Sequence, residues 1–260
     1  MEKHALHQRI RALRASSKHL AASSEQERNA LLLTIAENLR TAYPAIASAN
    51  DADVKAARES GQKESLIKRL IFSEEKLEAS LAGILQVAQL ADPIGKVKLR
   101  RLLDTGLLLE QVTFPIGVIG MIFEARPDAL IQIVSLCLKS GNGIILKGGR
   151  EAQRTNTVLV DVIKHSCVDS HLGDAWLTLL ESHSDVDQIL GMDDEIDLLI
   201  PRGSNQFVKY VMEHTSIPVL GHADGICHLY IDEKADLQKA VEIAFDSKTQ
   251  YPAACNAVET

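Results

Sequence analysis

Up to residue 90, apolar residues recur at the spacing of helices. A first helix is predicted over 5–20, where one face carries Leu and Ile and the remainder carries Arg, His and Ser. Ser24 followed by Glu27 has the spacing of a capping box, which predicts that a second helix begins there. The same spacing predicts helices over 46–58 and 74–90. The first part of the chain is therefore expected to be helical.

Beyond residue 97 the hydrophobic pattern changes from helix to strand. Asp104-Thr105-Gly106 between Leu-rich stretches predicts a β-hairpin over about 97–114. Short apolar runs then alternate with helical patterns at 129–139 and 155–165, as expected for parallel strands buried on both faces. The predicted strands are 117–123, 143–147, 177–180, 196–200, 219–220 and 228–232. This alternation predicts an α/β fold with a doubly wound parallel sheet and ligands at its strand ends.

Composition narrows the class of protein. The chain has 260 residues, 46% of them hydrophobic, which is enough for a substantial core. Its 28 basic and 35 acidic residues give a net charge of −7, and no basic stripe is present, so neither nucleic acid nor an anionic membrane is an expected partner. No apolar run reaches the roughly 18 residues of a membrane helix. The polar segment after Met1 is also unlike a signal peptide.

The four cysteines are far apart in the sequence. No CxxC pair or His/Cys cluster has the spacing of a zinc site, so no metal is expected. Scattered thiols fit a reducing compartment, and we expect a cytoplasmic protein. Cys255 stands out because small, polar and turn-forming residues surround it, whereas a structural cysteine normally lies in an apolar run. It is the candidate nucleophile.

Two predicted strand ends carry candidate nucleotide contacts. Lys147 is followed by Gly148 and Gly149, which would let the backbone approach a ribose or phosphate. Gly203-Ser204 follows another strand, where Ser204 would cap a helix whose amides face an anion. The alternatives are a solvated lysine at a strand exit and an ordinary strand-to-helix turn. Neither a Walker A loop nor a GxGxxG turn is present.

Two further turns carry charged or titratable residues. Arg126 offers a planar, charged fork to a carboxylate or phosphate, or else it pairs with Glu124 or Asp128 and only shapes its loop. His222 lies in the turn Gly221-His222-Ala223-Asp224-Gly225. Its alternative roles are those of an acid, a base, a phosphate contact or simply a part of a polar turn. The residues alone leave these alternatives open.

Six motifs in order along the chain resemble the γ-glutamyl phosphate reductase (glutamate-5-semialdehyde dehydrogenase) family, a branch of the aldehyde dehydrogenase superfamily. They are residues 123–128, 138–143, 146–149, 200–204, 221–228 and 251–257. The last two also resemble the reductase half of the bifunctional proline-pathway synthase. Since no kinase-like segment precedes Met1, a stand-alone reductase is the simpler expectation.

The resemblance implies NADPH-dependent reduction of L-glutamyl 5-phosphate to L-glutamate 5-semialdehyde and phosphate, the second step of proline biosynthesis. Cys255 matches the family's nucleophile, which forms a thioester, and backbone amides around Cys255 and Asn256 would stabilise the oxyanion. Lys147, with Gly148 and Gly149, matches the superfamily's contact with the adenosine ribose. Gly203-Ser204 matches its turn at the cofactor phosphates.

Two residues depart from the aldehyde-oxidising members of the superfamily. Arg126 stands where those enzymes usually have an oxyanion-hole asparagine, and His222 stands where they have a general-base glutamate. Without that base, water is not activated against the thioester, which fits a reductase. Arg126, His222 and Glu124 are accordingly expected to bind the substrate's phosphate or carboxylate.

The resemblance also implies a division into domains. Residues 1–231 would form the cofactor-binding domain, with an oligomerisation hairpin at 97–114, and residues 232–260 would begin a catalytic domain that continues in the family. A homo-oligomer and functional coupling to glutamate 5-kinase are expected. The alternatives are a non-catalytic nucleotide-binding or oligomerising fragment, and an NAD(P)-dependent dehydrogenase of free aldehydes.

Overall fold

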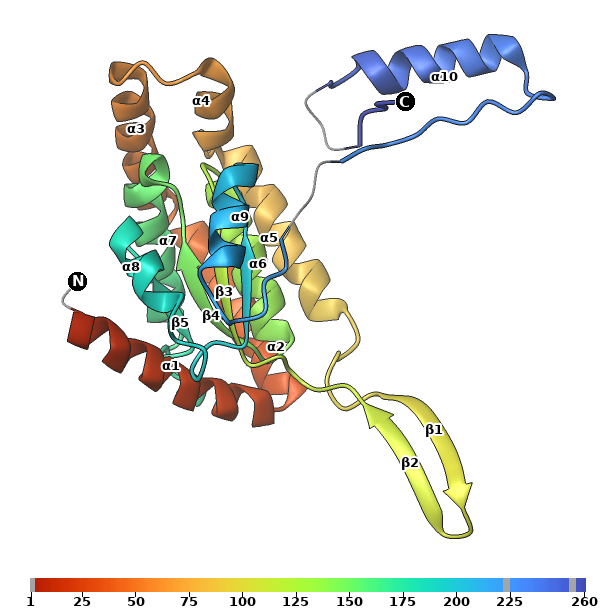
Figure 1. Ribbon diagram of the computed structural model, residues 1–260. Coiled ribbons are helices and arrows are strands. Elements are labelled where there is room, and N and C mark those ends of the chain that lie inside the picture. The colour runs from red at the N-terminus through yellow and green to blue at the C-terminus, as the bar shows by residue number, and fades with distance from the viewer. Residues whose placement is uncertain (1–2, 222–224, 253–255) are drawn as a thin grey trace. The chain divides into compact units, whose positions relative to one another are not determined.

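The helical pattern up to residue 90 forms five helices in the computed structural model (Figure 1). They are α1 (Lys3–Ala22), α2 (Glu25–Thr41), α3 (Tyr43–Glu59), α4 (Glu64–Leu70) and α5 (Glu74–Gln89). The predicted capping box is confirmed: the Ser24 hydroxyl accepts a hydrogen bond from the Glu27 N–H, and the Glu27 carboxylate accepts one from the Ser24 N–H. The short helix α4 is absent from the sequence-based prediction.

The structure describes residues 3–221, 225–252 and 256–260, in two compact units that divide between residues 221 and 222. The first unit holds the helices up to α9 and the strands β1 to β6, and the second holds α10. The division predicted at 1–231 and 232–260 lies later in the chain and stays a prediction. Within the described ranges, no helix is both long and apolar enough to cross a membrane.

Four parallel strands form the central sheet in the order β5–β4–β3–β6. They are β3 (Val118–Ile122), β4 (Gly143–Lys147), β5 (Leu177–Leu179) and β6 (Leu198–Pro201), and Val219 adds a single parallel bridge to Leu199. The chain builds outward from β3 through β4 to β5 and then returns to place β6 on the other side of β3. The doubly wound sheet is thus confirmed, and its direction of winding reverses between β3 and β6.

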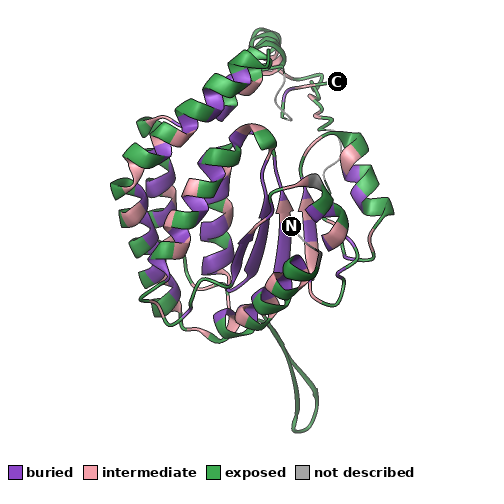
Figure 2. Ribbon diagram, turned by 90° about the vertical axis from the view of Figure 1, so that its left-hand side faces the viewer, coloured by how far each residue is buried: buried purple, intermediate pink, exposed green. Residues whose placement is uncertain are grey.

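Side chains along each strand alternate between two helical layers. Ile144 and Leu146 of β4 pack into a core with α2 and α5, whereas Ile145 packs into a second core with α1. The remaining helices of these layers are α6 (Pro127–Lys139) and α7 (Gln153–Ser166) on the first face, and α8 (His183–Ile189) and α9 (Asn205–Glu213) on the second. Figure 2 shows the buried strands between these helices. Burial on both faces explains why the strands are continuous apolar runs.

Strands β1 (Val97–Asp104) and β2 (Leu107–Val112) form the predicted hairpin. Gly106 in the turn has a φ of +80°, a conformation that suits glycine. Every residue of both strands is exposed, and the hairpin projects from the helices and the central sheet (Figure 1). The second strand ends at Val112 rather than Phe114, although the Thr113 N–H still donates to the Lys96 carbonyl at 3.0 Å.

The second unit contains helix α10 (Leu237–Thr249). The strand predicted over 228–232 is wrong: these residues form no ladder with any described segment, and only Cys227 makes an isolated bridge, to Val258. Apolar residues of α10 are exposed, Leu237 and Phe245 among them. A β-strand needs the backbone groups of a neighbour, which its own sequence pattern does not provide.

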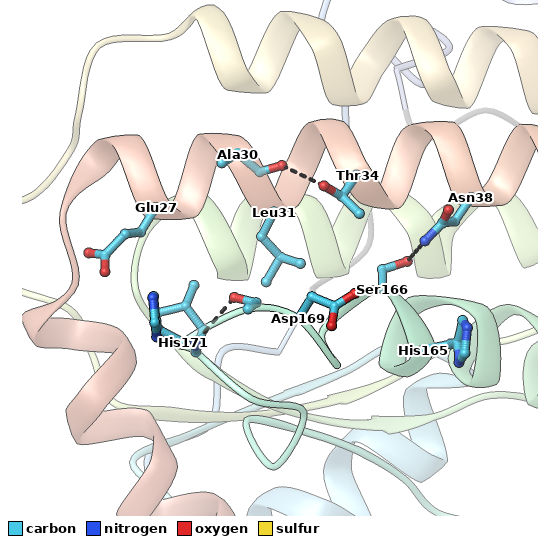
Figure 3. A pocket seen from close by; sticks show the side chains of 11 residues that line it. Glu27, Ala30, Leu31, Thr34, Asn38, His165, Ser166, Asp169 and His171 are labelled. Atoms are coloured by element: carbon cyan, nitrogen blue, oxygen red, sulfur yellow. Dashed lines mark hydrogen bonds between the residues drawn. The ribbon is translucent and has the colours of Figure 1, made fainter.

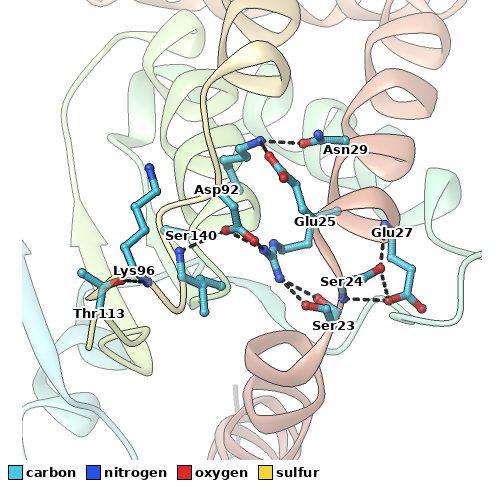
Figure 4. Close-up of polar contacts among 12 residues, drawn as sticks. Ser23, Ser24, Glu25, Glu27, Asn29, Asp92, Lys96, Thr113 and Ser140 are labelled. Atoms are coloured by element: carbon cyan, nitrogen blue, oxygen red, sulfur yellow. Dashed lines mark hydrogen bonds and ion pairs between the residues drawn. The ribbon is translucent and has the colours of Figure 1, made fainter. Parts of the chain in front are cut away.

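A buried cation joins α2 to the segment before the hairpin (Figure 4). Arg28 is completely buried, and its Nη2 donates to both carboxylate oxygens of Asp92, at 2.8 and 2.7 Å. Lys139, at the end of α6, donates to Glu25, to Asn29 and to the Ala88 carbonyl at 2.8–3.1 Å. The contact of Arg28 thus connects α2 to the segment before the hairpin, and those of Lys139 connect α6 to α2 and α5.

Candidate functional site

A pocket of about 580 Å³ lies at the carboxyl ends of β3, β4 and β6. Three segments that are far apart in the sequence line it: Glu124 after β3, residues 147–151 at the end of β4, and residues 202–204 after β6. This is the place where the direction of winding reverses, which is where open α/β sheets bind ligands. Val186 of α8 and Phe207 of α9 add apolar walls.

Lys147 is the last residue of β4 and is only 3% exposed. Its Nζ donates to the Gly148 carbonyl at 2.5 Å. Burial lowers the pKa of Lys147, the Glu151 carboxylate acts in the opposite direction, and the Arg150 guanidinium lowers the pKa further. A cation held in this state is stabilised when an anion or a hydroxyl oxygen enters the pocket.

The Gly148 turn lies against a buried amide. A Cβ at Gly148 would be 2.1 Å from Nδ2 of Asn156, so no larger residue fits there without displacing Asn156. Asn156 is 2% exposed, and its Oδ1 has no hydrogen-bond partner among the residues that the structure describes. The adjoining hollow of about 10 Å³ has room for roughly one water-sized group. Because an unpaired buried acceptor is costly, this oxygen favours a bound donor.

Asp53 of α3 fixes the start of α7, which carries Asn156. Its carboxylate accepts hydrogen bonds from both the N–H and the hydroxyl of Thr155, each at 2.8 Å, and Asp53 is buried. A residue distant in sequence thus caps α7 and positions the amide beneath the Gly148 turn.

Gly203 and Ser204 also line the pocket. The predicted cap is confirmed, because the Ser204 hydroxyl accepts a hydrogen bond from the Phe207 N–H at 3.3 Å. Helix α9 therefore begins at the pocket. The N-terminus of a helix carries a partial positive charge that favours anions such as phosphate.

The predicted substrate residues are not all brought together. Glu124 lines the pocket, whereas Arg126 is exposed at the start of α6 and is absent from its lining. Among the described residues, Arg126 forms no ion pair with Glu124 or Asp128, so that alternative is not realised. Asn256 is exposed in the second unit. Cys255 and His222 lie outside the described residues.

The sequence-based prediction omits three charged residues of the pocket: Arg150, Glu151 and Arg202. Arg150 and Glu151 follow the Lys-Gly-Gly run directly, and Arg202 precedes Gly203. Adjacency to predicted site residues is the signal that would have identified them. With Lys147 and Glu124 they place three cations and two carboxylates in the lining.

A second hollow, of about 490 Å³, lies between α2 and the end of α7 (Figure 3). Its polar lining is partly occupied by internal contacts: Asn38 donates to Ser166, and Thr34 donates to the Ala30 carbonyl. None of the predicted site residues lies there. In the part of the chain that the structure describes, no group of three or more His, Cys, Asp or Glu residues is placed to hold a metal ion.

Comparison with known proteins identifies the group of enzymes that this chain resembles. The model of the aldehyde dehydrogenase family matches residues 1–258. A γ-glutamyl phosphate reductase of Synechocystis is 50% identical over 256 residues, which are 98% of this chain and 59% of the relative. The chain therefore spans less than two thirds of the length of this relative.

Solved structures agree with the sequence comparison. The γ-glutamyl phosphate reductase of Thermotoga maritima has a TM-score of 0.93 and 34% identity, over 98% of this chain and 62% of that protein. The reductase of Saccharomyces cerevisiae has a TM-score of 0.78 and 42% identity, over 97% and 64% of the respective chains. The resemblance inferred from the six motifs is confirmed.

Proposed function

Because the chain belongs to the aldehyde dehydrogenase family, we propose that it provides the cofactor-binding part and the nucleophile of a γ-glutamyl phosphate reductase. The reaction would be the reduction of L-glutamyl 5-phosphate to L-glutamate 5-semialdehyde and phosphate, with NADPH as the reductant, in proline biosynthesis. The 50% sequence identity to an enzyme of that name supports this substrate.

The pocket at the strand ends is the observation that carries the proposal. It brings Lys147, Gly148, Gly149, Gly203 and Ser204 together, although they come from two distant segments. Lys147 and the Gly148 turn would hold the adenosine ribose, and the start of α9 would hold the cofactor's phosphates. The Oδ1 of Asn156, which has no partner in the described part of the chain, supports this fit, because a ribose hydroxyl or a bound water would satisfy it.

The proposed chemistry begins at Cys255. Its thiolate attacks the acyl carbon of L-glutamyl 5-phosphate, the bond to phosphate oxygen breaks, and a thioester forms. NADPH, when bound, supplies the hydride that reduces this thioester. Amides around Cys255 and Asn256 would stabilise each tetrahedral oxyanion, whose collapse releases first phosphate and then the aldehyde with the Cys255 thiolate.

Arg126, Glu124 and His222 are proposed to bind the substrate. The exposed Arg126 guanidinium is suited to a phosphate or carboxylate. If Arg126→Ala left the substrate KM unchanged, this role would be excluded. His222 in place of a general-base glutamate would leave water inactive against the thioester, so phosphate rather than water would accept the acyl group in the reverse direction.

The reverse reaction tests the function. Reduction of NADP⁺ by glutamate semialdehyde is expected to require inorganic phosphate and to disappear in Cys255→Ser. Turnover without phosphate would instead indicate an ordinary aldehyde dehydrogenase. Nucleotide binding without any turnover would indicate a non-catalytic nucleotide-binding part.

We further propose a cytoplasmic homo-oligomer assembled through the β1–β2 hairpin, with functional coupling to glutamate 5-kinase. The exposed leucines of the hairpin support the assembly, since an isolated two-stranded hairpin is only marginally stable in water. The spacing of the cysteines supports a reducing compartment.

A further inference from the structure

The hollow between α2 and the end of α7 is separate from the pocket at the strand ends (Figure 3). Helix α7 has 14 residues, so its two ends are about 20 Å apart. Asn156, near the start of α7, lies against the Gly148 turn, whereas Ser166, at its end, lines the hollow. Residues 169–172, which follow α7, and one side of α2 complete the lining. A ligand of this hollow is therefore distinct from a ligand of the strand-end pocket.

The apolar and the charged groups of the lining differ in how deeply they lie. Leu31 and Leu172 are buried, with 3% and 8% of their surface exposed. The side chains that can carry a charge are exposed, namely Glu27, His165, Asp169 and His171. A molecule in the hollow would thus meet apolar carbon beneath it and polar atoms around it. The volume of about 490 Å³ leaves ample room for a molecule of the size of an amino acid.

Several of the polar groups have hydrogen-bonding capacity to spare. The side chains of His165, Asp169 and His171 form no hydrogen bond or ion pair within the residues that the structure describes. The Ser170 hydroxyl accepts a hydrogen bond from the Leu172 N–H at 3.1 Å, which leaves its own O–H to donate. Each imidazole and this hydroxyl can donate, and the Asp169 carboxylate only accepts. The hollow therefore offers both kinds of partner to a ligand.

The two kinds of partner are separated along the hollow. In Figure 3, His171 lies at the end marked by Glu27, and Asp169 lies toward Ser166. The C-terminal end of a helix carries a partial negative charge, so α7 adds to the attraction of Asp169 for a cation. At the other end, the pKa of Glu27 is lowered, first by hydrogen bonds from Ser24 and further by His171. His171 thus lies close enough to offset part of the charge of Glu27.

We propose that this hollow binds a free α-amino acid with an apolar side chain. The ammonium group of the ligand donates to Asp169 beside the end of α7, and its carboxylate accepts from His171 and the Ser170 hydroxyl. The side chain of the ligand lies over Leu31 and Leu172. A zwitterion satisfies both ends of the hollow, whereas an ion with a single charge leaves one end unmatched. The proposal does not depend on the proposed function.

Binding of small molecules to the 260-residue chain tests the proposal. Isothermal titration would compare L-leucine with isopentylamine, which lacks only the carboxylate, and with isocaproate, which lacks only the ammonium group. L-Leucine is expected to bind at one site, and each single ion about tenfold more weakly, because one set of charge-assisted hydrogen bonds is lost. Glycine should also bind about tenfold more weakly, because it has no side chain to cover the two leucines.

Matched variants locate the site. Asp169→Asn and His171→Gln are each expected to weaken the binding of L-leucine about tenfold. Asp161→Asn, on an exposed residue of α7 outside the lining, should leave the affinity unchanged. Arg126→Ala, in the proposed substrate site, should leave it unchanged as well. Thermal unfolding of all four variants should match that of the parent, because the substituted residues are exposed.

Several results would overturn the proposal. If isopentylamine or isocaproate bound as tightly as L-leucine, the hollow would not select a zwitterion. Equal binding of glycine would exclude a role for the apolar floor. If Asp169→Asn and His171→Gln both kept the affinity, or if Arg126→Ala lost it, L-leucine would bind elsewhere. Absence of binding would exclude the site, while phosphate-dependent reduction of NADP⁺ would still test the proposed function separately.

Discussion

At the scale of single residues, the environment of each thiol separates structural cysteines from a candidate nucleophile. Burial raises the pKa of Cys137 to about 12 and that of Cys167 to about 11, from an ordinary value of 9.0. Both are buried in the core around the first face of the sheet. Since the thiolate is the reactive form, these two cysteines are protected both from solvent and from ionisation.

Thiol labelling tests this separation. In the native protein at pH 8, we expect a thiol reagent to modify at most Cys227 and Cys255, and to modify all four cysteines after unfolding. Cys255→Ser should reduce by one the number of thiols that the reagent modifies in the native protein. Rapid native labelling of Cys137 would contradict its burial.

The same thiols predict a loss of stability at high pH. The folded-state pKa of Cys137 lies above its unfolded value, so its neutral form contributes stability that is complete below about pH 9 and is lost as the pH rises toward 12. Chemical unfolding measured between pH 8 and 11 should show this decline. It should be less steep in Cys137→Ala, after correction for the lower stability of that variant at pH 8.

Gly148 and Gly149 form a matched pair for mutation. Gly148→Ala would force a methyl group against the buried Asn156, and we expect a loss of about 1–3 kcal/mol in unfolding free energy together with weaker nucleotide binding. Gly149→Ala meets only the flexible end of Glu151 and should change stability by less than about 1 kcal/mol. Equal effects in the two variants would show that Asn156 is not the restraint.

At the scale of secondary-structure elements, the β1–β2 hairpin has few contacts within its own chain that would stabilise it. Its strands pair only with each other among the described residues, and Leu102 and Leu108 are opposite one another and 67% and 50% exposed. One ion pair, between Arg100 and Glu110, crosses the two strands. Apolar surface of this extent normally marks an interface.

We therefore expect Leu102→Lys/Leu108→Lys to reduce the oligomeric state. Because both side chains are exposed, the unfolding free energy of the separated subunit should change by less than about 1 kcal/mol. Sedimentation velocity would measure assembly, and a variant with Arg101→Ala on the same strand would serve as the control. An unchanged sedimentation coefficient in the double variant would exclude assembly through this pair.

At the scale of the first unit as a whole, buried polar contacts join elements that are far apart in the sequence. Arg28 connects α2 to Asp92 before the hairpin, Lys139 connects α6 to α2 and α5, and Asp53 connects α3 to α7. Figure 4 labels Asp92, Glu25 and Asn29, which are partners in the first two of these contacts. Removing one partner of such a pair leaves a buried charge uncompensated.

Helix α2 provides a comparison between a buried and an exposed ion pair. Asp92→Ala should cost about 3–5 kcal/mol, because it leaves the completely buried Arg28 without its carboxylate. Glu78→Ala removes the carboxylate of the exposed Arg40, 2.9 Å away, and should cost less than about 1 kcal/mol. Urea unfolding measures both, and similar losses would contradict the dependence on burial.

Local patterns in the sequence were sufficient for most elements. The Ser24 cap, the helices α1 to α3 and α5 to α7, and the hairpin follow from hydrogen bonds and periodicities between residues close in the chain. The continuous apolar runs 117–123 and 143–147 likewise indicated buried strands. The six motifs were likewise sufficient to identify the family. The strand predicted at 228–232 failed because an apolar run becomes a strand only when a neighbouring segment pairs with it.

The tertiary structure decided which residues from distant segments line the same pocket. Parallel strands that meet at one edge bring the Lys147 turn next to Gly203 and Ser204, a proximity that residues more than fifty positions apart do not reveal in sequence. Burial left the Oδ1 of Asn156 without a hydrogen-bond partner among the described residues, and it lies beneath the Gly148 turn. The sequence by itself therefore determined the elements and the family, through short-range spacing. Only the long-range packing of the sheet determined which of its charges line the same pocket.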